Sequence, residues 1–220
     1  MHRKLLPLWM AVTMGGCATS AVLPDPAIDM DRTAPRQANR EDTAVFAGGC
    51  FWGVEAVFEQ LTGVQQVSAG FAGGDAASAH YEIVSSGLTR HAESVEIRYD
   101  PGKITYGQLL KIFFAVAHDP TQKNRQGPDW GAQYRSAIFY KDAEQQRIAE
   151  AYIKQLGDAH VFKSPIVTEV TALDRFYPAE EYHQQFVKRN PDYPYVVYND
   201  LPKLAKLKQE YAPMLKSQPR

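Results

Sequence analysis

Cysteine is scarce in this 220-residue chain, which has only Cys17 and Cys50 and none from Phe51 to Arg220. Two cysteines exclude a small scaffold that is held together by several disulfides. The sequence also lacks the CxxC and HExxH motifs of common zinc sites, and its six histidines are scattered. We therefore expect no metal and no bound cofactor.

An excess of one charge is also missing, since 24 basic residues face 25 acidic ones and the formal net charge is -1. A balanced chain offers no polybasic surface for nucleic acid and no acidic excess that would favour disorder. At this length the chain suffices for one domain with a sizeable core, and a second full domain would be cramped. The composition predicts one globular domain, which we expect to be monomeric.

The N-terminal apolar run, from Leu5 to Met14, is too short to span a bilayer. It follows two basic residues and precedes small ones, which is typical of an export signal. The four residues that end this segment, MGGC with Cys17 as the last, resemble the cleavage box of bacterial lipoproteins, although Met14 stands where leucine is usual. We predict an export signal over 1–17, lipidation of Cys17, and a periplasmic or cell-envelope protein held at a membrane. The alternative is an ordinary signal peptide cut nearby, which would leave a soluble protein.

Residues 18–42 show no apolar period and include Pro24, Pro26 and Pro35 among polar residues. This composition predicts a flexible tether. A single catalytic domain over 43–220 would follow it.

Apolar periodicity predicts the elements of that domain. Alternating or short apolar runs predict strands over 45–47, 64–71, 95–99, 134–140 and 166–172. Apolar residues at helical spacing predict helices over 50–63, 105–117, 142–156, 177–189 and 201–215. The first six elements follow the order of a split βαβ core, strand, helix, strand, strand, helix, strand. We expect an α/β (α+β) two-layer sandwich with a ferredoxin-like core and extra helices.

Cys50 lies at the turn between the first predicted strand and the first predicted helix. Free N–H groups at a helix start favour an anion, so we expect a lowered pKa for this thiol. Gly48, Gly49 and Gly53 remove side chains around it, which leaves room for a substrate. The alternative is a structural cysteine that packs as a small hydrophobic residue.

The string GCFWG, which places Phe51 and Trp52 directly after Cys50, resembles the active-site signature of A-type peptide methionine sulfoxide reductases. The resemblance extends from Val45 to Pro194 and includes AEEYHQQF near the end. It implies an enzyme that reduces the S-epimer of methionine sulfoxide, free or in proteins, with Cys50 as the nucleophile.

Sulfoxide reduction by a thiol needs a thiolate, a proton donor for the oxygen and an apolar slot for the methyl group. Phe51 and Trp52 offer flat apolar walls for the slot. For the donor, HAESVEIRYDP is similar to the family's motif around its catalytic glutamate, and Glu93 matches that residue. In an apolar pocket a carboxyl stays protonated and can donate. The alternative for Glu93 is a solvated surface glutamate.

The resemblance also identifies three substrate-binding residues, Tyr81, Asp129 and Tyr134. A tyrosine hydroxyl donates a hydrogen bond without carrying charge, which suits the sulfoxide oxygen. The alternatives are core tyrosines in strands and an aspartate that forms a turn. Pro128 and Trp130, on either side of Asp129, differ from the forms expected in the family.

Many members of that family carry further cysteines near the C-terminus that resolve the oxidised nucleophile, and this chain has none after Cys50. The sequence therefore resembles a one-cysteine form. Its sulfenic acid would be reduced by an external thiol, either a small thiol or a thioredoxin-like protein.

Two other functions stay open from the sequence. A thiol hydrolase would use Cys50 with His80 or His183 as its base. A lipid-tethered module that binds methionine-containing peptides would keep Cys50 as a structural residue only.

Overall fold

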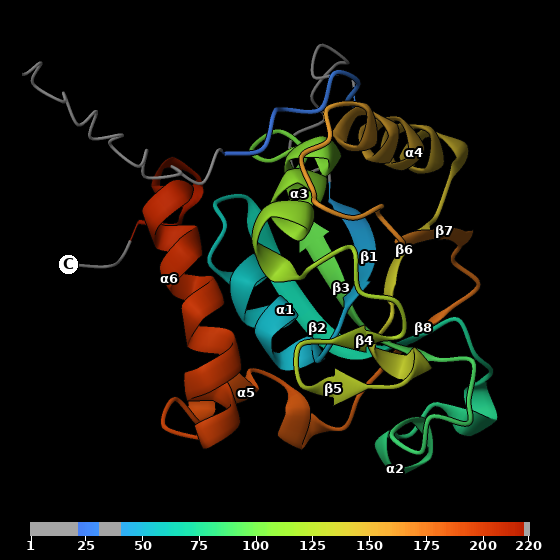
Figure 1. Cartoon of the computed structure of the whole chain (residues 1–220). Helices are drawn as coiled ribbons and strands as arrows, with labels where there is room; N and C mark the ends of the chain where they lie inside the picture. The colour runs from blue at the N-terminus through green and yellow to red at the C-terminus, as the bar shows by residue number, and fades with distance from the viewer. Residues whose placement is uncertain (1–21, 31–40, 218–220) are drawn as a thin grey trace, which may run out of the picture.

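A computed structural model describes residues 22–30 and 41–217 of the chain (Figure 1). Its main sheet has six strands in the order β7-β6-β1-β3-β2-β8. The strands of this sheet are β1 (Asp42–Gly48), β2 (Val64–Ala72), β3 (Ala92–Tyr99), β6 (Ser136–Tyr140), β7 (Glu169–Ala172) and β8 (Phe176–Pro178). All neighbouring strands are antiparallel except β6 and β7, which are parallel. The fold is therefore mixed α/β.

Six α-helices accompany the sheet in the described part of the chain, and two of them have only four residues. They are α1 (Phe51–Glu59), α2 (Tyr81–Val84), α3 (Tyr106–Ile112), α4 (Ala143–Asp158), α5 (Phe186–Arg189) and α6 (Leu201–Glu210). Two π-helical turns, η2 (Phe113–Ala117) and η5 (Val196–Asp200), extend α3 and precede α6. The 3-10 turns are η1 (Ala76–Ser78), η3 (Ala132–Tyr134), η4 (Glu181–His183) and η6 (Ala212–Met214), and β4 (Arg125–Gln126) pairs with β5 (Asp129–Trp130) in a small hairpin.

The main core lies between the sheet and the helices. Successive residues of β1 point to opposite faces, and both faces are buried. Phe46 packs against Phe58 of α1, Tyr106 of α3 and Phe113 of η2, so these helices share one face of the sheet. On the other face a smaller cluster around Phe139 is covered by residues that follow β7.

The predicted helix starts are confirmed where a local capping signal exists. Thr105 and Gln108 form a complete capping box at the start of α3, and Asp142 accepts a hydrogen bond from the Gln145 N–H at the start of α4. The helix predicted over 105–117 continues as α3 and η2, with its apolar face buried as expected.

The helix predicted over 177–189 is confirmed only at its end, where Phe186–Arg189 form α5, and is wrong before that. Residues 176–178 form β8, which pairs with the edge of β2, and the Ala179 N–H donates to the Ala69 carbonyl. The Gln184 amide bonds both backbone groups of Ala69. These long-range hydrogen bonds replace those of a helix, because an edge strand leaves its own N–H and C=O groups to be satisfied.

The tether predicted over 18–42 is wrong for the part that the structure describes, because residues 22–30 pack on the domain. We call these nine residues the strap. Leu23 and Met30 contact the core, and the Tyr152 hydroxyl donates to the Pro24 carbonyl. Asp29 accepts hydrogen bonds from the Thr105 hydroxyl and, at 2.9 Å, from the Gly107 N–H. Residues 31–40 and the predicted signal, with Cys17, lie outside the described residues.

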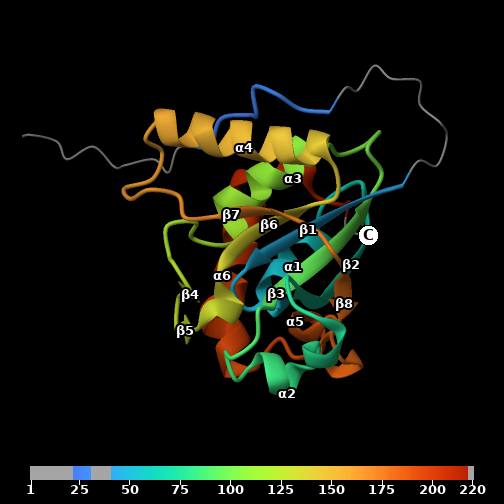
Figure 2. The same cartoon turned by 90° about the vertical axis from the view of Figure 1, so that its right-hand side faces the viewer.

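Figures 1 and 2 place the strap, α3 and α4 at one end of the molecule and α2, the β4–β5 hairpin and α5 at the other. Within the described ranges, 22–30 and 41–217, no helix has the length and apolar character needed to cross a membrane.

Candidate active site

Cys50 caps α1 at the end of β1, as the sequence predicts. The turn depends on Gly49, which has φ +90°, and a Cβ there would lie 2.5 Å from the Gln126 side chain. Only glycine fits that combination of left-handed backbone and close approach. The turn therefore sets the thiol at the N-terminus of the helix, where the chain leaves the sheet.

The predicted lowering of the Cys50 pKa is wrong. The residue is 9% exposed, and burial raises the pKa of its thiol well above the usual value, with the negative charges of Glu93 and Asp200 adding to the effect. The Trp52 N–H lowers the pKa, as expected at a helix start, but does not outweigh these effects. The resting site therefore holds a neutral thiol.

Glu93 is the second residue of β3 and is 2% exposed. Its Oε2 accepts a hydrogen bond of 3.1 Å from the N–H of Phe51, the residue that follows the cysteine. Burial raises the Glu93 pKa to about 8, opposed by this hydrogen bond and assisted by the charge of Asp129. The carboxyl is thus mostly protonated at neutral pH, and it is not a solvated surface glutamate.

Tyr81 and Tyr134 come from α2 and η3, two elements far apart in the sequence. Burial, and then the charge of Glu93, raises the pKa of Tyr81 to about 12 and also raises that of Tyr134. Cys50 contributes to both shifts, so the four groups lie close enough to interact. Both hydroxyls keep their protons and can donate hydrogen bonds at any ordinary pH.

The two aromatic residues after Cys50 have different surroundings. Phe51 is 1% exposed and packs against Phe71 and the rings of Tyr81 and His183, so it belongs to the core. Trp52 is only half-buried and stacks on Phe186, with ring centres 3.7 Å apart. Trp52 therefore offers the more accessible apolar wall.

Asp129 reaches the site from the β4–β5 hairpin and accepts a hydrogen bond from the Tyr195 hydroxyl. Burial raises the Asp129 pKa, while this hydrogen bond and Lys203 oppose the shift. The Tyr195 ring also meets Trp52 edge-on at 5.8 Å. Tyr195 is not predicted from the sequence, since one tyrosine in a tyrosine-rich loop shows no pattern that marks it.

His183 holds Trp52 in place. The indole N–H of Trp52 donates to Nδ1 of His183 at 3.1 Å, so the histidine proton sits on Nε2. Burial lowers the His183 pKa, and Nε2 is buried without a hydrogen-bond partner among the described residues. From the sequence, this histidine is a candidate only for the base of a hydrolase.

Asp200 and Lys203 were not predicted at all. Asp200 is fully buried, its Oδ1 lies 3.5 Å from the Lys203 Nζ, and burial raises its pKa to about 6. A Cβ at Gly53 would lie 2.0 Å from the same carboxylate oxygen. Gly53 therefore makes room for Asp200 rather than for a substrate.

The geometry does not support a cysteine hydrolase. Nδ1 of His183 is taken by Trp52, and the side chain of His80 is 66% exposed and pairs with Glu180 at 3.9 Å. Among the hydrogen bonds of the described residues, none joins Cys50 to either histidine. Nor do the residues that the structure describes include three metal-binding side chains grouped so as to hold an ion.

The predicted site residues of the domain are therefore brought together around one neutral thiol. Glu93 supplies an acidic proton, Tyr81 and Tyr134 supply neutral hydroxyl donors, and Trp52 supplies an apolar wall. Such a site suits a small neutral substrate with one apolar side and one oxygen that gains negative charge.

Comparison with known proteins agrees with this chemistry. Residues 42–215 match the family model described as "Peptide methionine sulfoxide reductase". The chain is 56% identical over 199 residues to peptide methionine sulfoxide reductase MsrA 2 of Synechocystis, with 90% of this chain and 92% of that protein covered. It is 54% identical to the protein of the same name from Mesorhizobium japonicum, with 84% and 94% covered.

Two solved structures share the fold. Methionine sulfoxide reductase A of Corynebacterium diphtheriae has a TM-score of 0.60 and 36% identity, with 80% of this chain and 87% of that chain covered. Reduced Mxr1 of Saccharomyces cerevisiae has a TM-score of 0.63 and 30% identity, with 71% and 90% covered.

Proposed function

The chain belongs to the peptide methionine sulfoxide reductase family and reduces methionine sulfoxide with thiols, and we propose that Cys50 and Glu93 carry out the chemical step. The observation that carries the assignment is the hydrogen bond between Glu93 and the Phe51 N–H. This hydrogen bond holds the protonated carboxyl of Glu93 next to Phe51, the residue that follows Cys50. Trp52, Tyr81, Asp129 and Tyr134 line the substrate site, whereas Phe51 is buried in the core and packs against the Tyr81 ring.

In the first half of the reaction the Cys50 sulfur bonds to the sulfoxide sulfur. The electron pair of the S–O bond moves to the oxygen, which Glu93 protonates while Tyr81 and Tyr134 donate hydrogen bonds to it. The neutral Cys50 thiol gives up its proton in the same step, and this proton restores the acid form of Glu93. The oxygen then passes to the Cys50 sulfur and methionine leaves, so that Cys50 becomes a sulfenic acid. The raised pKa of Glu93 supports this role, because only the protonated acid can donate.

An external thiol completes the cycle, because the chain has no cysteine after Cys50. One thiol displaces water from the sulfenic acid to form a mixed disulfide, and a second thiol releases Cys50. The net reaction converts one sulfoxide and two thiols into methionine, a disulfide and water. The thiol reductant is a small thiol or a thioredoxin-like protein, and no prosthetic group takes part.

The one-cysteine scheme predicts a stoichiometry. Without reductant, one equivalent of sulfoxide yields about one methionine per enzyme, and a sulfenic-acid trap labels Cys50. Methionine is counted by chromatography and the adduct by mass spectrometry of the intact protein. Two methionines per chain, or no adduct on the oxidised protein, contradict the scheme.

The S-epimer of the sulfoxide is the proposed substrate, and the close similarity to MsrA proteins supports this choice. With dithiothreitol as the reductant, the mature protein should consume methionine S-sulfoxide and largely spare the R-epimer. Equal rates on the two epimers would remove this part of the proposal.

We further propose that the protein is exported and held at a membrane of the cell envelope by a lipid on Cys17. The basic start, the short apolar run and the small residues before Cys17 support this location. When cells are separated into membrane and soluble fractions, the full-length protein should then be found with the membranes, and the Cys17→Ser variant should be found in the soluble fraction. An unlipidated mature N-terminus beyond Cys17 would leave export in place and end the proposed anchor.

The finer fold assignment is also a proposal. The four central strands lie in the order β6-β1-β3-β2 with antiparallel neighbours, which supports a split βαβ, ferredoxin-like core in two layers. The groups of the site lie between Cys50 and Lys203 and share one sheet-and-helix core, which supports a single catalytic domain over 43–220, and we propose that this domain acts as a monomer. Light scattering measures that state directly, and an obligate dimer would refute it.

A further inference from the structure

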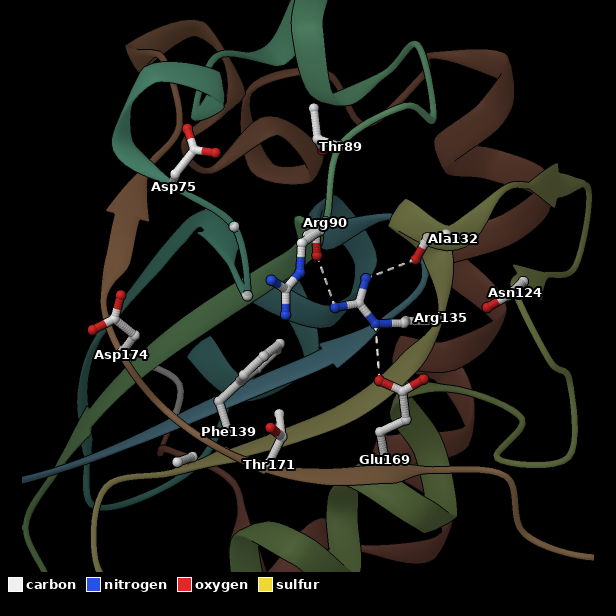
Figure 3. Close-up of a pocket in the computed structure, with 13 residues that line it drawn as sticks. Asp75, Thr89, Arg90, Asn124, Ala132, Arg135, Phe139, Glu169, Thr171 and Asp174 are labelled. Carbon is white, nitrogen blue, oxygen red and sulfur yellow. Dashed lines mark hydrogen bonds and ion pairs between the residues drawn. The ribbon is translucent and has the colours of Figure 1, made fainter.

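Arg135 follows the substrate-site residue Tyr134 directly but faces a different cavity. This cavity has a volume of about 690 Å³ and is lined by Arg135 together with Gly73, Arg90, Ala132 and Glu169, among others (Figure 3). Cys50, Glu93 and Tyr134 are not among its lining residues. The cavity is therefore next to the catalytic site without being part of it.

The guanidinium of Arg135 joins two separate backbone segments. Its Nη2 donates to the Arg90 carbonyl at 3.0 Å, and its Nη1 donates to the carbonyls of His91 at 3.2 Å and Ala132 at 3.0 Å. Its Nε donates to the carboxylate of Glu169 at 3.1 Å. Figure 3 shows the fork of Arg135 between the backbone oxygens of Arg90 and Ala132.

The two segments are those that carry the proposed oxygen-binding donors. Arg90 and His91 come just before β3, whose second residue is Glu93, and Ala132 begins the η3 turn that ends at Tyr134. A third segment approaches as well, because a Cβ at Gly73 would lie 2.9 Å from Nη2 of Arg135. The planar fork has fixed angles between its N–H groups, so it fixes the separation of the carbonyls that it binds.

We propose that Arg135 is a positioning residue that sets the distance between the Glu93 carboxyl and the Tyr134 hydroxyl around the sulfoxide oxygen. The proposal rests on the proposed function of these two donors. A catalytic group displaced by about 1 Å can cost about a hundredfold in rate, so a residue that touches no substrate can still control the chemical step.

The ion pair with Glu169 does not account for the arrangement by itself. The Glu169 side chain is 54% exposed, whereas that of Arg135 is 14% exposed. Exposed ion pairs contribute little, and the three bonds to carbonyl oxygens remain when Glu169 is neutral. Glu169→Gln is therefore the matched control.

The test compares Arg135→Ala, Arg135→Lys and Glu169→Gln in the full chain, with folding checked by thermal unfolding. Both arginine variants should slow the single-turnover reduction of methionine S-sulfoxide by about tenfold or more with substrate binding little changed. Lysine should not restore the rate, because it keeps the charge without the fork. Glu169→Gln should stay within about threefold of the parent. If Arg135→Ala does not fold, Arg135→Lys decides the outcome.

Two further readouts distinguish positioning from general stability. In the arginine variants Glu93 should become more solvated, so its pKa should fall and the alkaline limb of the rate profile should move to lower pH. Cys50, Asp129, Tyr81 and Tyr134, which also face Glu93, are unchanged in these variants. Guanidinium at low millimolar concentration should restore both the rate and the position of the alkaline limb in Arg135→Ala, since the cavity is open beside the missing group. Sodium chloride, the control for ionic strength, should restore neither.

Folded arginine variants within threefold of the parent rate overturn the proposal, and so does a slow variant whose alkaline limb is unmoved and which guanidinium does not rescue. Infrared titration of the Glu93 carboxyl, with Glu93→Gln as the reference, measures the same pKa without catalysis. A parent that does not reduce sulfoxide therefore ends the proposed function, while an unshifted Glu93 band in Arg135→Ala ends the positioning role.

Discussion

The two ends of the molecule satisfy their polar groups differently. At the strap end Asp29 receives hydrogen bonds from two groups at the start of α3, and the Tyr152 hydroxyl finds the Pro24 carbonyl. Buried side-chain atoms without a hydrogen-bond partner among the described residues occur at both ends, namely the neutral Tyr106 hydroxyl on α3 at the strap end, and Nε2 of His183 and Oδ2 of Asp200 at the active-site end. The pKa values of Cys50, Glu93 and Asp200 are all raised there, because their charged forms are poorly solvated.

This difference shows which end serves stability and which serves chemistry. Paired buried polar groups stabilise a fold, whereas unpaired or desolvated ionisable groups cost free energy and persist where a reaction uses them. Substitutions at the active-site end should therefore reduce activity and spare or raise stability. At the strap end they should reduce stability and spare activity.

The largest expected effect is that of Cys50→Ser. A serine hydroxyl does not replace the thiol as a nucleophile, so sulfoxide reduction should fall by at least about a thousandfold. The change nearly conserves volume, so the unfolding free energy should stay within about 1 kcal/mol of the parent. Single-turnover assays and chemical denaturation measure the two quantities. Undiminished sulfoxide reduction by this variant would remove Cys50 as the nucleophile.

Glu93→Gln should have the next largest effect on rate. The substituted amide can still accept the Phe51 N–H but has no acidic proton, so the chemical step should slow by about a hundredfold or more with binding little changed. In the parent the rate should fall as the pH rises through about 8, where Glu93 loses its proton, and this limb should vanish in the variant. Rates within twofold of the parent would remove Glu93 as the donor.

The same variant should be more stable than the parent at alkaline pH. The folded pKa of Glu93 is raised above its ordinary value of 4.5 to about 8, so the folded state binds more protons between these pH values. The parent therefore loses stability as the pH rises through this window, whereas the variant, with a neutral amide, does not. Denaturation at pH 4 and pH 9 should show a gain for Glu93→Gln only at the higher pH. No gain at pH 9 would mean that the carboxyl carries no cost of burial.

Asp29→Ala should give the smallest effect, and of the opposite kind. Loss of its bonds at the start of α3 should destabilise the protein by about 1 kcal/mol and lower the melting temperature by about 2–4 °C. Sulfoxide reduction should stay within twofold of the parent. Asp25→Ala is the matched control, because Asp25 is 83% exposed in its ion pair with Lys111 and should change stability little. Equal melting temperatures of both variants and the parent would show that the strap adds no stability.

Much of the fold was predictable because its signals are local. The capping residues Thr105 and Asp142 and the apolar periods around them predict α3 and α4, since a helix is formed by neighbours in the sequence. The first part of the segment over 177–189 was predicted wrongly because Gln184 bonds Ala69, more than a hundred residues earlier, and only Phe186–Arg189 is α-helical. The strap was missed for the same reason, since its partners on α3 and α4 lie far along the chain.

The sequence by itself determined the place of Cys50 at the strand-to-helix turn and, through the motif around it, the position of Glu93 on its strand. Only the tertiary structure decided their protonation. A helix start lowers a thiol pKa locally, but burial in the folded chain raises it, and the charges of Glu93 on β3 and Asp200 on η5 add to this effect. Tyr195, Asp200 and Arg135 are likewise ordinary residues in the sequence. They gain importance from contacts made across the fold, because desolvation and hydrogen bonding depend on what surrounds a group in space.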